Sequence, residues 1–396
     1  MRDVVIASYV RSAQSRCRPN DPGRDWLFKM RSDDLLARLL PEALKRAKVE
    51  PKEVDDFTMG CALAVNEQFS IGGRMPLLLA DLDQRTSCKL LDEQCGSTMA
   101  AFQMGFMEIA QGFADVVLVG GMEHMDRVPM GGGGSIELNL RMFQDPKLAH
   151  WDFFTAMNMG WTAEKMAGLG FKREDMDAWG ARSHQLAFKA QQEGFFDGEI
   201  LPIEVRQEDG SKMVVDKDQA VRSDATAEGM ADLRPAFRKD GTITAGNASP
   251  LNAGAVALVL MTKDQAKAKG IEPLAKVRSI GFAGVEPAIM GKGPVPSSRR
   301  ALEAAGLDVS DIDYWEINEA FAVVVLYAIR ELGLDPDKVN VKGGGIAIGH
   351  PLGATGGRII GTLARILKEK KARLGCATMC CGGGQGTAVI IENEAS

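Results

Sequence analysis

The stretch that decides the fold is Leu90–Gly105, with the sequence LLDEQCGSTMAAFQMG. A short strand-like run ends at Leu91, the small residues Cys95, Gly96 and Ser97 follow, and the mostly apolar run over 100–110 predicts a buried helix. Residues 115–119 are rich in valine and run into two glycines, which predicts a further strand. Strands that alternate with helices in this way indicate an α/β protein.

A similar arrangement recurs in the last third of the chain. The strand-like run Val339–Val341 leads into residues 343–358, GGGIAIGHPLGATGGR, and a helix is predicted over 357–368. Residues 376–391 are predicted to be a strand with neighbouring glycines. The recurrence predicts two related halves, although α/β proteins also repeat such units without duplication.

The remaining predicted elements lie before and after a predicted insertion. Between Met122 and Asn247 the rhythm of strands and helices stops, which predicts a long insertion with helices of its own. Pro41 lies inside one predicted helix and predicts a break or kink there. The other predicted elements are strands over 4–7, 57–63, 253–261 and 275–283, and helices over 33–47 and 299–305.

Length and composition exclude several classes of protein. A chain of 396 residues is longer than one hydrophobic core usually serves, which predicts two or more core-forming units. A composition of 45% hydrophobic and 25% charged residues excludes a disordered or fibrous chain. A net charge of −6 argues against a nucleic-acid-binding protein. No run approaches the length of a membrane span, the first residues resemble a strand rather than a signal peptide, and seven scattered cysteines fit a reducing compartment. We therefore expect a cytoplasmic protein.

Cys95 is the first candidate for chemistry. It precedes a predicted helix, where unpaired N–H groups and the helix dipole favour a thiolate, so it could be a nucleophile. The alternative is a small buried residue that fills a tight turn. His350 lies among seven glycines over 343–357 and could be the base that activates a thiol, or an incidental residue in a flexible turn.

Two further segments carry candidate groups. Only one of Cys380 and Cys381 can face a site, because successive strand residues point to opposite faces, and the glycines after them suggest a backbone oxyanion site. Cysteines 376, 380 and 381 with His350 do not match the usual zinc spacings. Asn318 could be part of a helix cap or could place its amide near a reacting carbonyl.

Together these segments resemble the thiolase family over nearly the whole chain, and look closest to bacterial 3-ketoacyl-CoA thiolases of fatty-acid β-oxidation. The matching segments, in order, are DEQCGSTMA, VGGMEHMDRVPM, MGWTAEKMA, LRPAF, GTITAGNAS, IMGKGPVP, EINEAFA, GGGIAIGHPLGATGGR and ATMCCGGGQG. The resemblance implies a duplicated five-layer αβαβα core: an N-terminal half over 1–121 and 248–274, an inserted loop domain over 122–247 that binds coenzyme A and the acyl chain, and a C-terminal half over 275–396.

The resemblance also implies a role for each motif residue. Cys95 aligns with the nucleophile that becomes an acyl-thioester, His350 with its base, and Cys380 with a second acid/base. The N–H of Gly382 would pair with that of Cys95 as an oxyanion site, and Asn318 would hold a water beside His350 as a second one. The residues expected to contact coenzyme A are Arg222, Ser249, Met159 and Phe321.

The implied activity is that of an acetyl-CoA C-acyltransferase, which cleaves 3-ketoacyl-CoA with coenzyme A to acetyl-CoA and a shortened acyl-CoA. Coenzyme A is then a substrate, and no metal or permanently bound cofactor is expected. The implied partners are a second or further copies of the chain, as a homodimer or homotetramer, and a hydratase/dehydrogenase subunit. The alternatives are an acetoacetyl-CoA thiolase and, in another class, an acyl-CoA or lipid carrier on the same scaffold.

Four positions depart from the family pattern. Asn158 stands where many short-chain biosynthetic thiolases have His, which favours longer substrates. Ala253 lacks a usual acidic residue, Cys381 replaces an apolar one, and Gly229 stands where some relatives have Ser. The methionines of the insertion could line an adaptable acyl tunnel or simply fill the core. They are Met122, Met125, Met130, Met142, Met157, Met159 and Met166.

Overall fold

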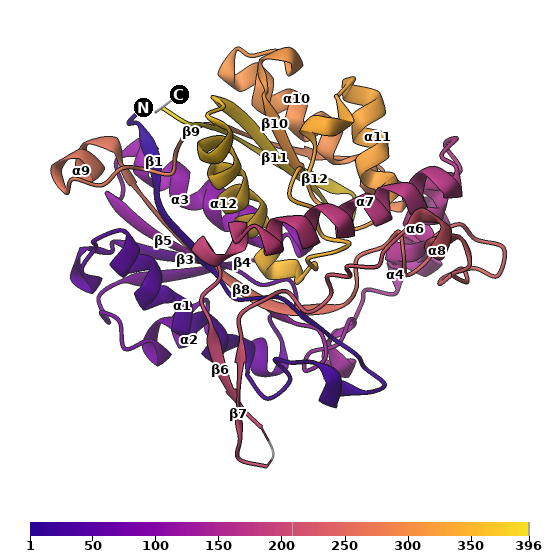
Figure 1. The fold of residues 1–396 in the computed structure, drawn as a ribbon, viewed down its shortest axis with the longest axis horizontal. Coiled ribbons are helices and arrows are strands. Elements are labelled where there is room, and N and C mark those ends of the chain that lie inside the picture. Colours follow the sequence, from indigo (N-terminus) through magenta and orange to yellow (C-terminus); the bar gives the residue numbers. More distant parts are fainter. Residues whose placement is uncertain (208, 395–396) are drawn as a thin grey trace.

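The computed structural model describes residues 1–207 and 209–394, and its main strands form one mixed sheet (Figure 1). Residue 208 of the predicted loop domain and residues 395–396 of the predicted C-terminal half lie outside the described residues. No described helix is long and apolar enough to cross a bilayer.

The N-terminal half contributes strands in the order β4-β3-β5-β8-β1. Strand β3 pairs in parallel with β4 and β5, while β8 pairs antiparallel with β5 and β1. The short strand β2 (Ser15–Arg16) also pairs with β8. The bounds are β1 Val4–Arg11, β3 Asp56–Gly60, β4 Ser87–Leu91, β5 Val116–His124 and β8 Asn252–Thr262.

The C-terminal half repeats this order. Strand β12 pairs antiparallel with β9 and β11, and β11 pairs in parallel with β10. Next to β10, a parallel bridge from Trp315 to Val339 occupies the position that β4 has in the first half. The two halves join where β1 pairs with β9 at Val5 and Ile6. The bounds are β9 Ala275–Gly284, β10 Tyr314–Ile317, β11 Leu374–Cys381 and β12 Gln385–Glu392.

The two halves of the sheet and three layers of helices make five layers, as the family resemblance implies. Helices α3 (Ser97–Gln111) and α12 (Leu352–Lys370) pack on each other between the halves (Figure 1). Helix α1 (Ser32–Arg46) packs on β5 and β8, and α10 (Pro294–Ala305) packs on β9 and β12. The smaller helices of these outer layers are α2 (Arg74–Leu79) and α11 (Ala322–Leu332), and α9 (Lys263–Ala268) follows β8.

Close approach of the two central helices requires glycine. A Cβ on Gly356 of α12 would lie 2.5 Å from the backbone nitrogen of Met99 in α3, and one on Gly121 would lie 2.1 Å from Thr98 Oγ1. Real Cβ atoms do not approach that closely, so a larger residue at either position would force the helices or strands apart.

Three predictions about local structure differ from what is observed. Pro41 does not break helix α1, which continues to Arg46 because the buried Leu40 and Leu44 anchor the helix to the core on both sides of the exposed Pro41. The single strand predicted over 376–391 is the hairpin of β11 and β12, which turns through Gly383 and Gly384 at φ of 81° and 86°. The predicted strand Val339–Val341 makes only isolated bridges.

The predicted insertion contains helices of its own, and β5 extends to His124, past the predicted boundary at residue 121. The longest helix is α7 (Arg173–Gln192), and a hairpin of β6 (Ile203–Arg206) and β7 (Lys212–Val215) projects from the body (Figure 1). The other helices are α4 (Arg141–Gln144), α5 (Phe153–Ala156), α6 (Met159–Ala167) and α8 (Ala227–Ala231).

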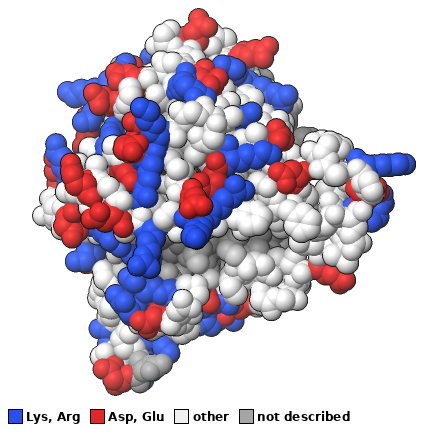
Figure 2. All heavy atoms as spheres, turned by 90° about the vertical axis from the view of Figure 1, so that its right-hand side faces the viewer, with Lys and Arg blue, Asp and Glu red and all other residues white. Residues whose placement is uncertain are grey.

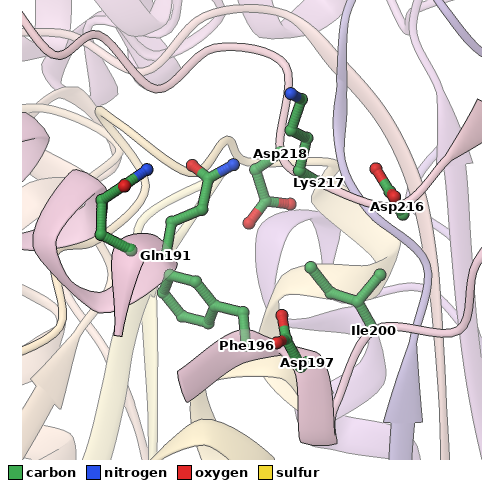
Figure 3. Close-up of a pocket in the computed structure, with 8 residues that line it drawn as sticks. Gln191, Phe196, Asp197, Ile200, Asp216, Lys217 and Asp218 are labelled. Atoms are coloured by element: carbon green, nitrogen blue, oxygen red, sulfur yellow. The ribbon is translucent and has the colours of Figure 1, made fainter. Parts of the chain in front are cut away.

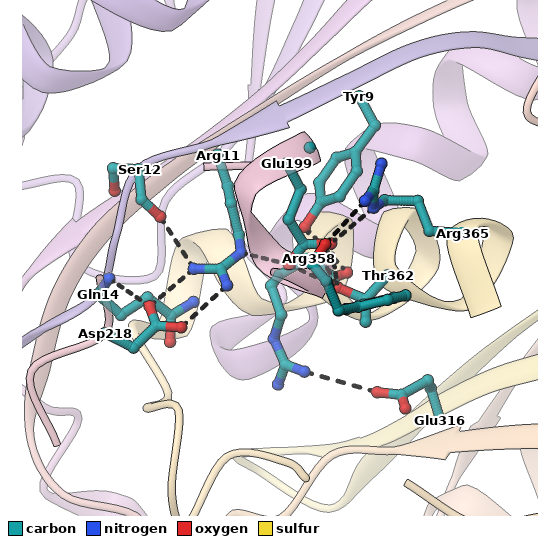
Figure 4. Close-up of polar contacts among 12 residues, drawn as sticks. Tyr9, Arg11, Ser12, Gln14, Glu199, Asp218, Glu316, Arg358, Thr362 and Arg365 are labelled. Atoms are coloured by element: carbon teal, nitrogen blue, oxygen red, sulfur yellow. Dashed lines mark hydrogen bonds and ion pairs between the residues drawn. The ribbon is translucent and has the colours of Figure 1, made fainter. Parts of the chain in front are cut away.

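A buried ion-pair network ties this insertion to β1 (Figure 4). The Arg11 guanidinium donates to Glu199 Oε1 at 2.7 Å and to both oxygens of Asp218 at 2.7 and 2.9 Å. The three side chains are 1% exposed or less. Since each acid accepts directly from the guanidinium, removal of Arg11 would leave Asp218 buried without its counter-ion and Glu199 with only the longer contact to Arg365 Nε at 3.5 Å.

We expect Arg11→Met to lower the free energy of unfolding by about 3–5 kcal/mol, because removing one member of a buried ion pair leaves an uncompensated charge. Denaturant unfolding measures the loss. Arg85→Met is the control, since Arg85 pairs with Asp83 at the surface and its loss should change little. Equal effects of the two substitutions would contradict the assigned role of the buried network.

Candidate functional site

Cys95 lies in a short 3-10 turn, Gln94–Gly96, directly before α3. Its side chain is buried, and the backbone N–H groups of Gly382 and of Cys95 itself are close enough to the sulfur to favour its thiolate form. Burial nevertheless raises the pKa of the thiol to about 12. In the free protein Cys95 is therefore a neutral thiol held beside two backbone donors.

The hairpin end of β11 brings Cys380 and Cys381 to the same place. Cys380 is fully buried, and burial followed by the neighbouring Cys95 raises its pKa. Cys381 fits against Gly96, where a Cβ would lie 2.5 Å from the Cys381 sulfur. Cys95, Cys380 and Gly382 therefore lie close together, whereas Cys381 packs against Gly96 of the Cys95 turn.

His350 precedes α12, as Cys95 precedes α3, and α12 packs against the Cys95 turn. Its Nδ1 lies 2.7 Å from Thr355 Oγ1, and that hydroxyl donates its own hydrogen to the Pro351 carbonyl at 2.8 Å. Thr355 must therefore accept from Nδ1–H, which leaves Nε2 unprotonated. Burial, followed by the charge of Arg358, lowers the His350 pKa to about 3.

Asn318 faces the free nitrogen of His350. Its Nδ2 lies 3.3 Å from His350 Nε2, while its Oδ1 is buried and has no described hydrogen-bond partner. A buried polar atom without a partner is a place where a small polar molecule binds favourably. This geometry fits the water that the resemblance assigns to Asn318, and the pair of side chains comes together as predicted.

Three residues that hold the His350 loop were missed by the sequence analysis. Asn252 Oδ1 accepts from the His350 N–H at 2.8 Å. Glu123 Oε2 accepts from the N–H groups of Gly353 and Ala62 at 3.0 and 2.9 Å. The third is Thr355, which fixes the imidazole. The Glu in GGMEHM and the Thr in PLGATGG were visible in the motifs, but nothing in their spacing indicates which distant groups they contact.

Arg222 lines a pocket of about 210 Å³ in the insertion, together with His184, Thr226 and Gly229. Its N–H donates to His184 Nδ1 at 3.3 Å, and burial and the positive charge of Arg222, followed by that of Arg16, lower the His184 pKa to about 4. Arg16, which the sequence analysis missed, thus adds positive charge near Arg222. Such charge suits an anionic ligand.

The other residues expected to contact coenzyme A line a second region. Ser249 donates its N–H to the Ala320 carbonyl at 3.0 Å, next to Phe321. The Phe321 ring packs edge-on against Phe237, and Phe237 packs on Gly160, directly after Met159. The structure therefore brings Ser249, Phe321 and Met159 near one another, but none of them lines the Arg222 pocket.

A face of the molecule next to the insertion is hollowed, and Lys and Arg side chains lie along the hollow despite the net negative charge (Figure 2). A different pocket of about 280 Å³ lies between α7 and the segment 216–218 (Figure 3). None of the predicted site residues lines that pocket, and its three carboxylates, Asp197, Asp216 and Asp218, outnumber its one cation, Lys217, which disfavours an anion.

The structure bears on three further points of the sequence analysis: Asn158, the methionines of the insertion and a metal at His350. Asn158 caps α6 by accepting from the Trp161 N–H at 3.1 Å. Met122, Met125 and Met166 are buried within the two hydrophobic cores, which favours core filling over a tunnel lining for these three. Among the described residues, His350 forms no close group of metal ligands with the cysteines of β11.

We expect the His350 imidazole to stay uncharged, with its proton on Nδ1, down to about pH 4, one unit above its lowered pKa of about 3. Nitrogen NMR of histidine-labelled protein measures both charge and tautomer, and a His350→Gln variant assigns the signal among the four histidines. Thr355→Val should weaken the Nδ1 preference, to which the Asn318 amide at Nε2 also contributes, while Thr355→Ser preserves it. Titration near pH 6.5 or a proton on Nε2 would refute this assignment.

Comparison with known proteins agrees with this geometry. The chain matches the thiolase N-terminal domain over residues 15–264 and the thiolase C-terminal domain over 271–393. It is 43% identical to a 3-ketoacyl-CoA thiolase of Marinobacter nauticus and 41% identical to one of Hahella chejuensis, each over 99% of this chain and 98% of the relative. The crystal structure of the Bacillus anthracis acetyl-CoA acetyltransferase superposes with a TM-score of 0.86 at 38% identity and covers 99% of both chains.

Two domain models that together span almost the whole chain, and relatives above 40% identity over its full length, agree with the duplicated fold and the paired Cys95 and His350 turns. The chain belongs to the thiolase family.

Proposed function

We propose that the protein is an acetyl-CoA C-acyltransferase that cleaves 3-ketoacyl-CoA with coenzyme A. The observation that carries the proposal is the convergence of the Cys95 thiol, the Cys380 thiol and the Gly382 N–H, beside helix α12, which begins two residues after His350. An acyl-CoA or lipid carrier would need none of these groups. The names of the relatives support 3-ketoacyl-CoA as the substrate class.

In the first half-reaction the Cys95 thiol gives its proton to His350 Nε2, and the sulfur attacks the C3 carbonyl. The oxyanion that forms accepts from the N–H groups of Cys95 and Gly382, which lie near the sulfur. The C2–C3 bond then breaks, and its electron pair passes to C2 as the enolate of acetyl-CoA. Cys380 protonates C2, and a thiol whose pKa is raised keeps its proton until that carbanion forms.

In the second half-reaction coenzyme A gives its thiol proton to the Cys380 thiolate and attacks the acyl carbon. The Cys95 sulfur leaves and takes its proton back from His350. Asn318, with a water beside His350 Nε2, stabilises the enolate oxygen, and removal of one such donor typically costs about 10²–10³ in rate.

Coenzyme A is a substrate in this proposal. Its anionic part lies along the basic region that includes Arg222 and Arg16, and its chain passes Ser249, Met159 and Phe321 towards Cys95. The pocket beside Arg222 and the basic edge of the hollowed face support this path (Figure 2).

The test is thiolysis of a substrate series from acetoacetyl-CoA to long-chain 3-ketoacyl-CoA. We expect turnover of the longer substrates, and we expect Cys95→Ser to lose at least about 10³-fold in kcat while it still binds coenzyme A. Mass spectrometry should find the acyl group on Cys95 after brief exposure to substrate.

Cys88→Ser is the matched control, because Cys88 is a half-buried free cysteine on β4 outside the site. Turnover of acetoacetyl-CoA alone would select the acetyl-CoA C-acetyltransferase alternative. An acyl adduct on Cys380 only would reverse the cysteine roles, and binding without turnover in the wild type would select the carrier.

The assembly that the surface supports is a homodimer through β4. This strand lies at the sheet edge, and four large apolar side chains near it are 48–64% exposed, which marks an interaction surface. They are Phe69, Ile71, Leu78 and Leu79. The homotetramer and the hydratase/dehydrogenase partner rest on family resemblance alone, and the cytoplasmic location rests on seven free cysteines.

Light scattering of the purified protein should give the mass of two chains, and Leu78→Glu should shift it towards one chain by burying a charge in the interface. Val214→Glu is the control, because Val214 is similarly exposed on the distant β7. A dimer mass that is unchanged by Leu78→Glu would place the interface elsewhere.

A further inference from the structure

A cluster of potential metal ligands lies outside the catalytic site, where the loop after β2 meets the end of β5. It contains Cys17, Asp25 and His124, which are 5%, 4% and 0% exposed. One ligand atom from each residue lies within 4.8 Å of the others. The Cys17 sulfur is 3.3 Å from Asp25 Oδ2 and 4.0 Å from His124 Nδ1. Ligand atoms in a tetrahedral zinc site lie about 3.5 Å apart, so little movement would close this site around an ion.

The backbone orients each of these ligands. His124 Nε2 lies 3.2 Å from the Leu27 carbonyl, which can only accept, so Nε2 carries the proton and Nδ1 presents its lone pair to Cys17. Asp25 Oδ1 accepts from the Leu27 N–H at 2.9 Å, which leaves Oδ2 for the cluster. A ligating histidine that donates its other N–H to a carbonyl is the arrangement found around protein-bound metals.

Asp126 lies beside this group of three ligands without belonging to it. Its Oδ2 accepts from the Arg18 N–H at 2.6 Å, while its Oδ1 is buried with no described hydrogen-bond partner. The carboxyl approaches both the Asp25 carboxyl and the Cys17 thiol. Two adjacent carboxyl groups with a buried orphan oxygen are costly unless a proton or a cation lies between them.

We propose that Cys17, Asp25 and His124 bind one zinc ion that fixes the loop after β2 to the end of β5. Thiolate, imidazole and carboxylate together suit zinc, and a water molecule completes the tetrahedron around three protein ligands. Binding displaces the Cys17 thiol proton to solvent and changes no oxidation state. The site uses none of the catalytic cysteines and is independent of the proposed thiolysis.

The test is metal analysis of the full-length protein after equilibration with zinc and removal of free metal, and then cobalt substitution. We expect about one zinc per chain and a near-ultraviolet thiolate-to-cobalt band. Cys17→Ser should abolish the band, and Asp25→Asn, which keeps the shape of the side chain, should weaken zinc binding by at least about tenfold. Cys88→Ser and Cys95→Ser should keep the band.

A chelator should lower the thermal unfolding midpoint of the wild type but not that of Cys17→Ser, which separates loss of metal from loss of fold. A wild type that binds no metal, or a band that survives in Cys17→Ser, would overturn the proposal. A band that is lost in Cys95→Ser and kept in Cys17→Ser would place the metal at the reaction centre and also overturn it.

Discussion

The contact between α3 and α12 is the constraint on which the arrangement of the catalytic groups depends. Each helix begins after a turn that carries one reactive group, Cys95 before α3 and His350 before α12. Glycine at Gly356 and Gly121 lets these helices and the adjoining strand approach within distances that any Cβ would prevent. Because the two halves repeat one topology, equivalent turns, one with Cys95 and the other with His350, meet at the middle of the molecule.

Two buried carboxylates fix the turn that carries His350. Glu123 accepts from the N–H of Gly353 after the histidine, and Glu319 accepts from the N–H of Ile346 before it. Glu319 also accepts from Ser183 Oγ and Trp179 Nε1, so the insertion helix α7 shares this anchor. A glycine-rich segment is conformationally free by itself, and these acceptors restrict it to one geometry.

The same burial decides the charge state of the site. It raises the Cys95 pKa to about 12 and lowers the His350 pKa to about 3, so the free protein holds a neutral thiol and a neutral imidazole rather than an ion pair. In the proposed reaction, charge develops only as bonds to the substrate form, near the N–H groups of Cys95 and Gly382. A resting thiol of this kind is also less exposed to oxidation than a thiolate.

The sequence by itself determined the α/β class, the order of most elements, the interrupted first half and the motif residues Cys95, His350, Cys380 and Asn318. These follow from local periodicity, turn chemistry and short motifs, which the chain carries residue by residue. Only the tertiary structure decided that α1 passes through Pro41 and that Thr355 sets the tautomer of His350. Likewise, only the fold brings Cys17 and Asp25 to His124, about a hundred positions away along the chain. The physical reason is that such contacts depend on how distant segments pack, and no local pattern records which buried group a side chain meets.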